Sequence, residues 1–379
     1  MKERSSTEMD NKLDTIEEIL LMGPGPSCIH DAVYSALSRK TLGHMDSHFI
    51  AIMDEVKKLL QIVMQTENKM TIPVSGTGSA GMETCFVNLI ERRDPVLILI
   101  NGVFGKRMED VATRLGARVD SLEFEWGTPV IPERVEEKLK TAEYKIVAVV
   151  HAETSTGVRN PVEHISQILK GKDSFFLVDT VTSLGGIKVA VDEWGVDALY
   201  SGTQKCLSCP PGLAPVSFSD RAVDAISRRD TKVPNWYLDI SMLTQYWGGK
   251  SRVYHHTAPI NMIYALYQAL LLVKEEGLEK VFSRHMDNHV LLVEGLENMG
   301  LEMLVSQEYR LPMLNSVCIP EGVADAEVRS RLRNDYKIEI GAGLGPLAGK
   351  IWRVGLMGHT ARPENVERVL KALKEILNK

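Results

Sequence analysis

Short apolar runs that alternate with helical stretches constrain the fold of this chain more than any other feature. Seven runs rich in valine, isoleucine and leucine cover residues 69–75, 95–101, 117–124, 144–151, 175–180, 198–202 and 214–219. The stretches 80–92, 105–116 and 132–142 between them carry apolar residues at helical spacing. Strands of this kind, alternating with helices, are typical of a mostly parallel sheet covered on both faces. We therefore predict an α/β fold that binds its ligand at the carboxyl ends of the strands.

A different pattern begins after residue 259. The amphipathic stretch 260–300 predicts two helices broken near Gly277. Strand-like segments follow at 301–305, 315–320, 338–343 and 350–357, with a helix at 324–336 and a closing helix from Pro363. The sequence thus predicts an N-terminal arm (1–23) in which Gly and Pro prevent regular structure, a large domain (24–276) and a small C-terminal α+β domain (277–379).

Composition argues against several classes of partner. The 379 residues carry a net charge of -6 with scattered basic residues, so we expect neither a nucleic-acid nor a membrane partner. No apolar run approaches the roughly 20 residues that span a bilayer, and the N-terminus does not resemble a targeting signal. Five cysteines spread over a long chain argue against a disulfide framework. These features predict a cytoplasmic protein.

Cys206 and Cys209 form a C-x-x-C motif, which could be a redox pair or half of a zinc site. A redox pair belongs at the start of a helix, but Pro210 and Pro211 follow at once. A structural zinc site needs four ligands, and no second pair completes this one. We interpret the two cysteines as bystanders and expect no metal site.

The glycine-rich turn "SGTGSAG" lies between a predicted strand and a predicted helix. Gly76, Gly78 and Gly81 match the G-x-G-x-x-G fingerprint of dinucleotide-binding proteins, so a nicotinamide-dependent dehydrogenase is a rival hypothesis. That fingerprint expects an acid at the end of the next strand, which ends here in Asn101. What remains is a helix start that offers N–H groups and a positive dipole end to a phosphate.

Three further strand ends carry reactive side chains. Asp179 ends one strand, the hydroxyl-rich "HAETSTG" (151–157) ends a second, and Lys205 follows a third. Each alone is more readily explained as a cap, a turn or a surface residue. On one sheet edge together with the glycine turn, they match what pyridoxal 5′-phosphate needs. These needs are a lysine for the Schiff base, an acid that keeps the pyridine nitrogen protonated, and a cup for the phosphate.

Taken in order, the motifs resemble those of a known family. They are "GPGP", "SGTGSAGME", "NGVFGKR", "HAETSTG", "LVDTVTSLGG", "YSGTQK", "YLDI", "VYHHTAP" and "WRVGLMG". The set is similar to class V aminotransferases of fold type I, and most similar to the alanine–glyoxylate and serine–pyruvate (serine–glyoxylate) group. This resemblance covers nearly the whole chain. It implies ping-pong transfer of an amino group, with pyridoxal 5′-phosphate as cofactor, from alanine or serine to glyoxylate or pyruvate.

The resemblance also implies which residues act. Lys205 would form the Schiff base and then shuttle a proton between the substrate Cα and C4′ of the cofactor, while Asp179 would pair with the pyridinium nitrogen. Arg353 would bind the substrate carboxylate, close to the backbone of Gly25. The other implied cofactor contacts are Thr77, Gly78, Ser79 and Gln204 at the phosphate, Thr154 at the phenolic oxygen, Phe104 and Val181 on the ring, and Tyr254 and Thr257 reaching the phosphate of the neighbouring subunit. The implied assembly is a homodimer with shared active sites.

Two positions depart from the family pattern, and some alternatives stay open. The best-known animal members have Trp where this chain has Phe104, and His where it has Ser79, which could alter cofactor affinity or donor preference. With Arg353 as the one assigned cation, a small neutral substrate is favoured, although Arg252 could supply a second cation. A transaminase for 3-hydroxykynurenine or 2-aminoethylphosphonate and a cysteine desulfurase-like lyase remain alternatives.

Overall fold

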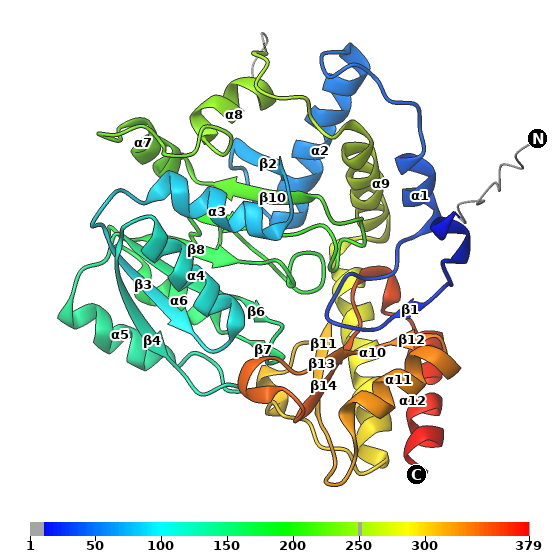
Figure 1. Ribbon diagram of the computed structural model, residues 1–379. Helices are drawn as coiled ribbons and strands as arrows, with labels where there is room; N and C mark the ends of the chain where they lie inside the picture. Colours follow the sequence, from blue (N-terminus) through cyan, green and yellow to red (C-terminus); the bar gives the residue numbers. More distant parts are fainter. Residues whose placement is uncertain (1–10, 249–251, 379) are drawn as a thin grey trace, which may run out of the picture.

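The computed structural model describes residues 11–248 and 252–378, and a seven-stranded sheet forms its centre (Figure 1). The order is β2-β10-β9-β8-β5-β3-β4, and all seven predicted strands are in it. Their bounds are β2 (Met70–Ser75), β3 (Pro95–Ile100), β4 (Arg118–Glu123), β5 (Ile146–Val150), β8 (Phe175–Asp179), β9 (Ala198–Tyr200) and β10 (Leu213–Phe218). Only β10 runs antiparallel to its neighbours, so the prediction of a mostly parallel sheet is confirmed.

Helices pack on this sheet because one side of each carries the apolar residues. In α2 the buried Phe49, Met53, Val56, Leu60 and Val63 recur at helical spacing. Helices α1 and α2 pack against α9, and α3 and α4 pack on strands of the sheet (Figure 1). The bounds are α1 (Asp31–Leu37), α2 (Ser47–Met64), α3 (Gly78–Leu89), α4 (Val103–Arg114), α5 (Pro132–Thr141), α6 (Val162–Leu169), α7 (Asp220–Ser227), α8 (Ile240–Trp247) and α9 (Ile260–Glu276).

The C-terminal elements form a second apolar cluster, below the large sheet in Figure 1. The chain breaks at Gly277, whose φ of 85° ends α9, and this confirms the predicted break. Buried Trp352 lies in this second cluster. Its elements are α10 (Leu278–Asn298), α11 (Asp325–Asp335), α12 (Pro363–Leu377) and the antiparallel strands β11 (Leu314–Cys318), β14 (Ile351–Gly355) and β13 (Gly341–Ala342). The predicted domain boundaries, between residues 23 and 24 and between residues 276 and 277, stay a prediction.

Several local expectations were wrong. Residues 20–21 were predicted to be irregular, but β1 (Leu20–Leu21) pairs in parallel with β12 (Ile338–Glu339), and Met22 is buried in the C-terminal cluster. Strand partners more than 300 residues away override the local Gly and Pro signal. Residues 301–305 contribute only an isolated bridge from Met303 to Val317, and the segment 338–343 divides into β12 and β13, which have different partners. Residues 1–10 of the predicted arm lie outside the described residues.

Short elements complete the chain. They are β6 (Ala152–Glu153), β7 (Val158–Arg159) and the 3₁₀ helices η1 (Lys12–Thr15), η2 (Gln307–Tyr309), η3 (Gly345–Leu347) and η4 (Gly358–Thr360). Among the helices of the described residues, none combines the length and apolarity that crossing a bilayer requires.

Candidate active site

A cavity of ≈ 230 Å³ opens at the carboxyl edge of the large sheet. The strand register aligns Val150 with Asp179 and Asp179 with Tyr200, so the loops that follow β5, β8 and β9 meet at this edge. The structure thus brings together nine of the residues named from the sequence. These are Thr77, Gly78, Ser79, Phe104, Thr154, Asp179, Val181, Gln204 and Lys205.

Lys205 presents a partly buried amine to the cavity. Its Nζ donates a hydrogen bond to Pro24 O, and a Cβ on Gly25 would lie 2.6 Å from Lys205 Cδ. Gly25 therefore lies directly against the lysine, which leaves no room for a side chain there. Burial, and then the nearby charge of Arg353, lower the pKa of Lys205 to about 8, so a substantial fraction of the amine is neutral near physiological pH.

Asp179 is buried at the end of β8 and accepts two hydrogen bonds. Val181 N donates to its Oδ1 at 2.8 Å, and Tyr200 Oη donates to its Oδ2 at 2.7 Å. Burial raises the pKa of Asp179 to about 7, and the charge of Glu153 adds to that rise. A cationic ring nitrogen in the cavity would favour the ionised carboxylate. Tyr200 was not predicted from the sequence, where its only signal is its place at the end of the neighbouring strand.

The start of α3 forms one wall of the cavity. Thr77, the residue before this helix, supplies no side-chain cap, so the first amides of α3 keep their hydrogen-bonding capacity for a ligand. Beside it, Gln204 Oε1 is buried and has no hydrogen-bond partner among the described residues. The amides at the start of α3 are donors and fit the phosphate of pyridoxal 5′-phosphate, to which Gln204 could donate only through its amide nitrogen, while Lys205 and Asp179 fit the aldehyde and the pyridine nitrogen of the cofactor. Asn101, at the position of the missing acid, bonds instead to Thr128 O and Asn160 Oδ1.

Glu153 is a buried carboxylate that sequence reasoning missed, although it lies within "HAETSTG". Its Oε2 accepts hydrogen bonds from the amides of Phe104 (3.1 Å) and Gly105 (3.4 Å), and its Oε1 accepts from Ser155 Oγ (2.6 Å). It therefore caps α4 from another segment, because Gly102 at the helix start has no side chain. A Cβ at Gly102 would overlap the carboxyl group of Glu153. This cap fixes the first turn of α4, which presents Phe104 to the cavity.

Arg353 reaches the same region from β14 of the C-terminal cluster. Its Nε donates to Ala342 O at 2.7 Å, and its Nη1 donates to Thr154 O at 3.1 Å. The guanidinium is buried, yet it forms no ion pair with any carboxylate of residues 11–248 or 252–378. Burial lowers its pKa to about 10, which keeps the charge at neutral pH. The structure thus places an unpaired cation beside Thr154 and near Lys205.

Two other arginines differ in their relation to the cavity. Arg252 pairs with Asp54 and does not line the cavity of its own chain, so the structure gives it no role as a second substrate cation there. Arg107 does line it, with its guanidinium carbon 4.9 Å from the ring centroid of Phe104. The sequence analysis missed Arg107 because a lysine or arginine on a helix is usually a solvated surface residue.

Tyr254 and Thr257 do not line the cavity of their own chain. The Tyr254 hydroxyl lies 3.2 Å from Thr257 Oγ1, and more than half of the Tyr254 surface is exposed. Their place at the phosphate of a neighbouring subunit stays a prediction.

The cysteine pair is buried behind the lysine. Burial raises the pKa of both Cys206 and Cys209 to about 12, so neither is a thiolate at neutral pH. Cys206 packs with Leu311, Met313 and Met357 in a small apolar cluster that is separate from the two large ones. Within the described residues, no group of three or more His, Cys, Asp or Glu side chains is placed to hold a metal ion.

Comparison with known proteins agrees with this geometry. Residues 30–368 match the family model of class V aminotransferases. The chain is 40% identical to the (S)-ureidoglycine–glyoxylate transaminase of Bacillus subtilis (94% of this chain, 90% of the relative) and 40% identical to the alanine–glyoxylate aminotransferase of Rattus norvegicus (96% and 88%). The crystal structure of alanine–glyoxylate aminotransferase from Nostoc sp. superposes with a TM-score of 0.95 at 47% identity and covers 100% of both chains.

Proposed function

The chain belongs to the class V aminotransferases, and from this premise we propose that it transfers the amino group of alanine or serine to glyoxylate or pyruvate. It is a pyridoxal-phosphate-dependent enzyme, as this family and fold are. The two half-reactions alternate, because donor and acceptor use the same site in turn.

Arg353 carries the proposal about substrate class. A buried guanidinium without an anionic partner is costly unless a ligand supplies the anion, and a planar carboxylate fits it in a bidentate manner. Both amino acids and 2-oxo acids have such a carboxylate. Arg353 is therefore proposed to orient the substrate, with Lys205 acting at the substrate Cα.

The other residues of the cavity have proposed roles that follow from their contacts. When bound, the cofactor supplies an electron sink for the carbanion that forms at the substrate Cα. Lys205 Nζ, with its lowered pKa, would take the proton from that Cα and pass it to C4′ of the cofactor, and would move a proton in the reverse direction in the second half-reaction. Asp179, held by Val181 N and Tyr200 Oη, provides the negative charge that favours a protonated ring nitrogen. Phe104 and Val181 would enclose the ring, Thr154 would contact the phenolic oxygen, and Thr77, Gly78, Ser79 and Gln204 would hold the phosphate, since all of them line this one cavity.

The names of the relatives support glyoxylate as acceptor. The Bacillus and rat proteins differ in the donor that their names state, but both names state glyoxylate. A small neutral donor agrees with the buried Arg353 guanidinium, which has no ion pair among the described residues, while Arg107, which lines the cavity itself, requires that dicarboxylates be tested too. A desulfurase reaction needs a reactive thiol, and Cys206 and Cys209 are protonated and buried.

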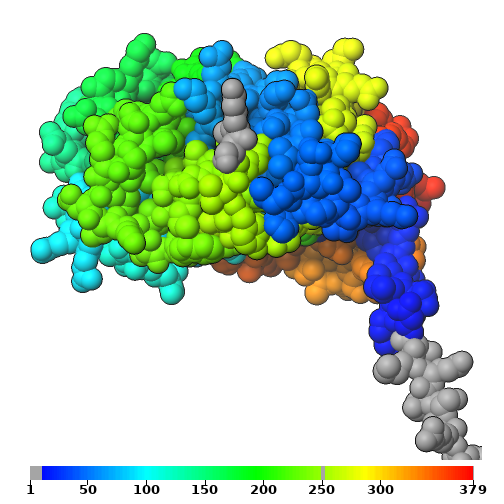
Figure 2. All heavy atoms as spheres, turned by 90° about the horizontal axis from the view of Figure 1, so that it is seen from above, coloured from blue at the N-terminus to red at the C-terminus, as the bar shows by residue number. Residues whose placement is uncertain are grey.

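We propose a homodimer in which Tyr254 and Thr257 complete the partner's site. Trp236 and Tyr254 are exposed, and Trp236 stacks on His255 with ring centroids 4.3 Å apart. Exposed aromatic side chains held in place by stacking are typical of interfaces. The N-terminal segment, dark blue in Figure 2, also projects from the body of the molecule and exposes Leu13 and Ile16.

A panel of donors and acceptors tests the activity. Alanine, serine, glycine, aspartate and (S)-ureidoglycine would each be assayed with glyoxylate and with pyruvate, on purified protein with bound cofactor. The proposal expects alanine or serine with glyoxylate to give the highest kcat/KM. The Arg353→Ala variant should raise KM for donor and acceptor by about 10²-fold, the loss of a charge-assisted bidentate contact. An unchanged KM in this variant, or preference for aspartate, would contradict the proposed substrate class.

Mixing two inactive variants tests the shared site. Lys205→Ala and Tyr254→Ala homodimers would be unfolded together and refolded, so that half of the dimers are mixed. Each mixed dimer has one intact site, so activity should recover to roughly a quarter of wild type if the subunits share sites. No recovery, despite a dimer by light scattering, would refute the shared site. The cytoplasmic location stays a prediction that cell fractionation can test.

A further inference from the structure

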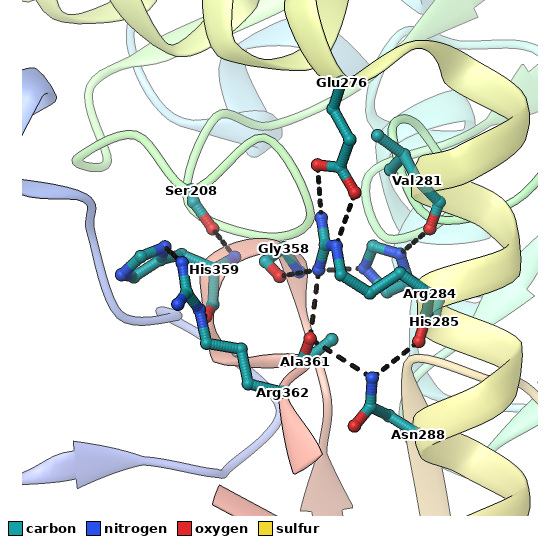
Figure 3. Close-up of polar contacts among 10 residues, drawn as sticks. All are labelled: Ser208, Glu276, Val281, Arg284, His285, Asn288, Gly358, His359, Ala361 and Arg362. Carbon is teal, nitrogen blue, oxygen red and sulfur yellow. Dashed lines mark hydrogen bonds and ion pairs between the residues drawn. The ribbon is translucent and has the colours of Figure 1, made fainter. Parts of the chain in front are cut away.

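A second set of polar contacts joins the C-terminal unit to the turn that carries Lys205 (Figure 3). Ser208, three residues after Lys205, accepts a hydrogen bond at its Oγ from His359 N at 2.7 Å. The same Oγ lies 3.1 Å from Ser27 Oγ, which donates to Lys205 O at 2.8 Å. The loop 358–361 is thus connected to the backbone of the lysine through two hydroxyl groups.

The turn at Gly358 packs tightly against the turn at Ser208. Gly358 has a φ of 53°, and a Cβ there would overlap Ser208 Oγ and lie 2.5 Å from Cys206 O. Ser208 has a φ of 48°, in the left-handed region that residues other than glycine rarely occupy. A small shift of either turn would therefore break the contact or produce a clash.

Helix α10 holds the loop from the other side. Arg284 Nη1 donates to Gly358 O at 2.7 Å and to Ala361 O at 3.1 Å, while Glu276 pairs with the Nε and Nη2 of the same guanidinium at 2.6 and 2.9 Å. His285 Nε2 accepts from Gly358 N at 2.9 Å. Figure 3 shows these side chains converging on the loop, with Ser208 on its opposite side.

We propose that Arg284, His285 and Ser208 are positioning residues that set the distance between Lys205 and Arg353. The proposal rests on the proposed function, in which these two groups bind opposite ends of the substrate. Arg353 lies on β14, five residues before Gly358, and Lys205 lies three residues before Ser208. The contact between loop 358–361 and Ser208 therefore lies only a few residues along the chain from each of these two groups.

Substrates that differ only in the carboxylate provide the test. The first half-reaction would be followed by cofactor absorbance, with alanine and with ethylamine, which has the amine but no carboxylate. Displacing Arg353 by about 1 Å costs up to 10²-fold, so Arg284→Gln and Ser208→Ala should each lower kcat/KM for alanine at least tenfold. Ethylamine does not contact Arg353, and its rate should change less than about twofold.

Arg221→Gln is the matched control. Arg221 pairs with Asp197 through two nitrogens and also donates to the carbonyls of Asp173 and Ser174, at the opposite edge of the sheet. The Arg221→Gln variant should lower the melting temperature as Arg284→Gln does, but it should leave the ratio of alanine to ethylamine reactivity unchanged. Equal loss for both amines in Arg284→Gln and Ser208→Ala, or the same ratio change in Arg221→Gln, would overturn the proposal.

A measurement without turnover separates this proposal from the proposed function. The charge of Arg353 contributes to the lowered pKa of Lys205. In cofactor-free Arg284→Gln and Ser208→Ala, the pH midpoint of the reaction with pyridoxal phosphate should therefore shift, and in Arg221→Gln it should not. An unchanged midpoint in the first two variants would refute the positioning role. Wild-type protein that transfers no amino group from any donor would instead refute the proposed function.

Discussion

Replacing Asp179 with asparagine is expected to stabilise the cofactor-free protein at pH 8 and to remove most of its activity once the cofactor is bound. Asp179 is buried, and its pKa rises from 3.8 to about 7. Between these two values the folded state holds a proton that the unfolded state has lost, so the free energy of unfolding falls as pH rises through this window. Above pH 7 the free energy of unfolding falls no further from this group.

The magnitude follows from the width of the window. A shift of roughly three pKa units, at 1.36 kcal/mol each, corresponds to about 4 kcal/mol at pH 8. At pH 5 only about one unit has been crossed, which corresponds to about 1 kcal/mol. Asparagine has no such penalty, and it can keep both contacts, because its oxygen can accept from Val181 N and its amide can donate to Tyr200 Oη. The variant should therefore gain about 3 kcal/mol on wild type between pH 5 and pH 8.

Urea unfolding of both cofactor-free proteins at pH 5 and pH 8 measures this difference, since groups away from the cavity titrate equally in both. The reasoning would be refuted if the difference in free energy of unfolding between the variant and wild type were the same at the two pH values. A variant less stable than wild type at pH 8 would refute it too. The cofactor-loaded variant should lose on the order of 10²–10³-fold in kcat, as when other preorganised electrostatic partners are removed. Wild-type activity in the variant would remove Asp179 from the proposed mechanism.

Three further predictions concern single groups around the cavity. Cofactor-free protein should react with pyridoxal phosphate at a rate that rises with pH through a midpoint near 8, because only the neutral amine of Lys205 attacks the aldehyde; a midpoint near the ordinary 10.5 would show that the amine is not perturbed. The double variant Cys206→Ser, Cys209→Ser should keep kcat/KM within about twofold, because neither thiol is ionised, and a loss above tenfold would restore a role for the pair. Glu153→Gln should lower the free energy of unfolding by about 1–3 kcal/mol, because both carboxylate oxygens accept from backbone amides (Phe104 and Gly105 at Oε2, Ser155 at Oε1) and a glutamine side chain has only one oxygen that can accept. Urea unfolding and a cofactor titration check this, and if both are unchanged the capping role is wrong.

The elements that local pattern specifies were predictable from the sequence. All seven strands of the large sheet and the break between α9 and α10 at Gly277 follow from apolar spacing and one glycine. The carboxyl ends of parallel strands share an edge, so Asp179 and Lys205 could be placed together before their distance was known. The pairing of β1 with β12 was not predictable, because it depends on a partner far away along the chain.

Sequence alone thus determined which residue types meet at one edge of one sheet, because hydrophobic periodicity sets the strands and their order along the chain sets the loops. Only the tertiary structure decided what those residues can do. Burial gives Asp179 a pKa of about 7 and Lys205 a pKa of about 8, and it leaves Cys206 protonated. The tertiary structure also decided that Arg252 forms an ion pair with Asp54, while Arg353 forms none with the described residues. Desolvation and the distance between charges depend on what surrounds a group in space, and no local stretch of sequence contains that information.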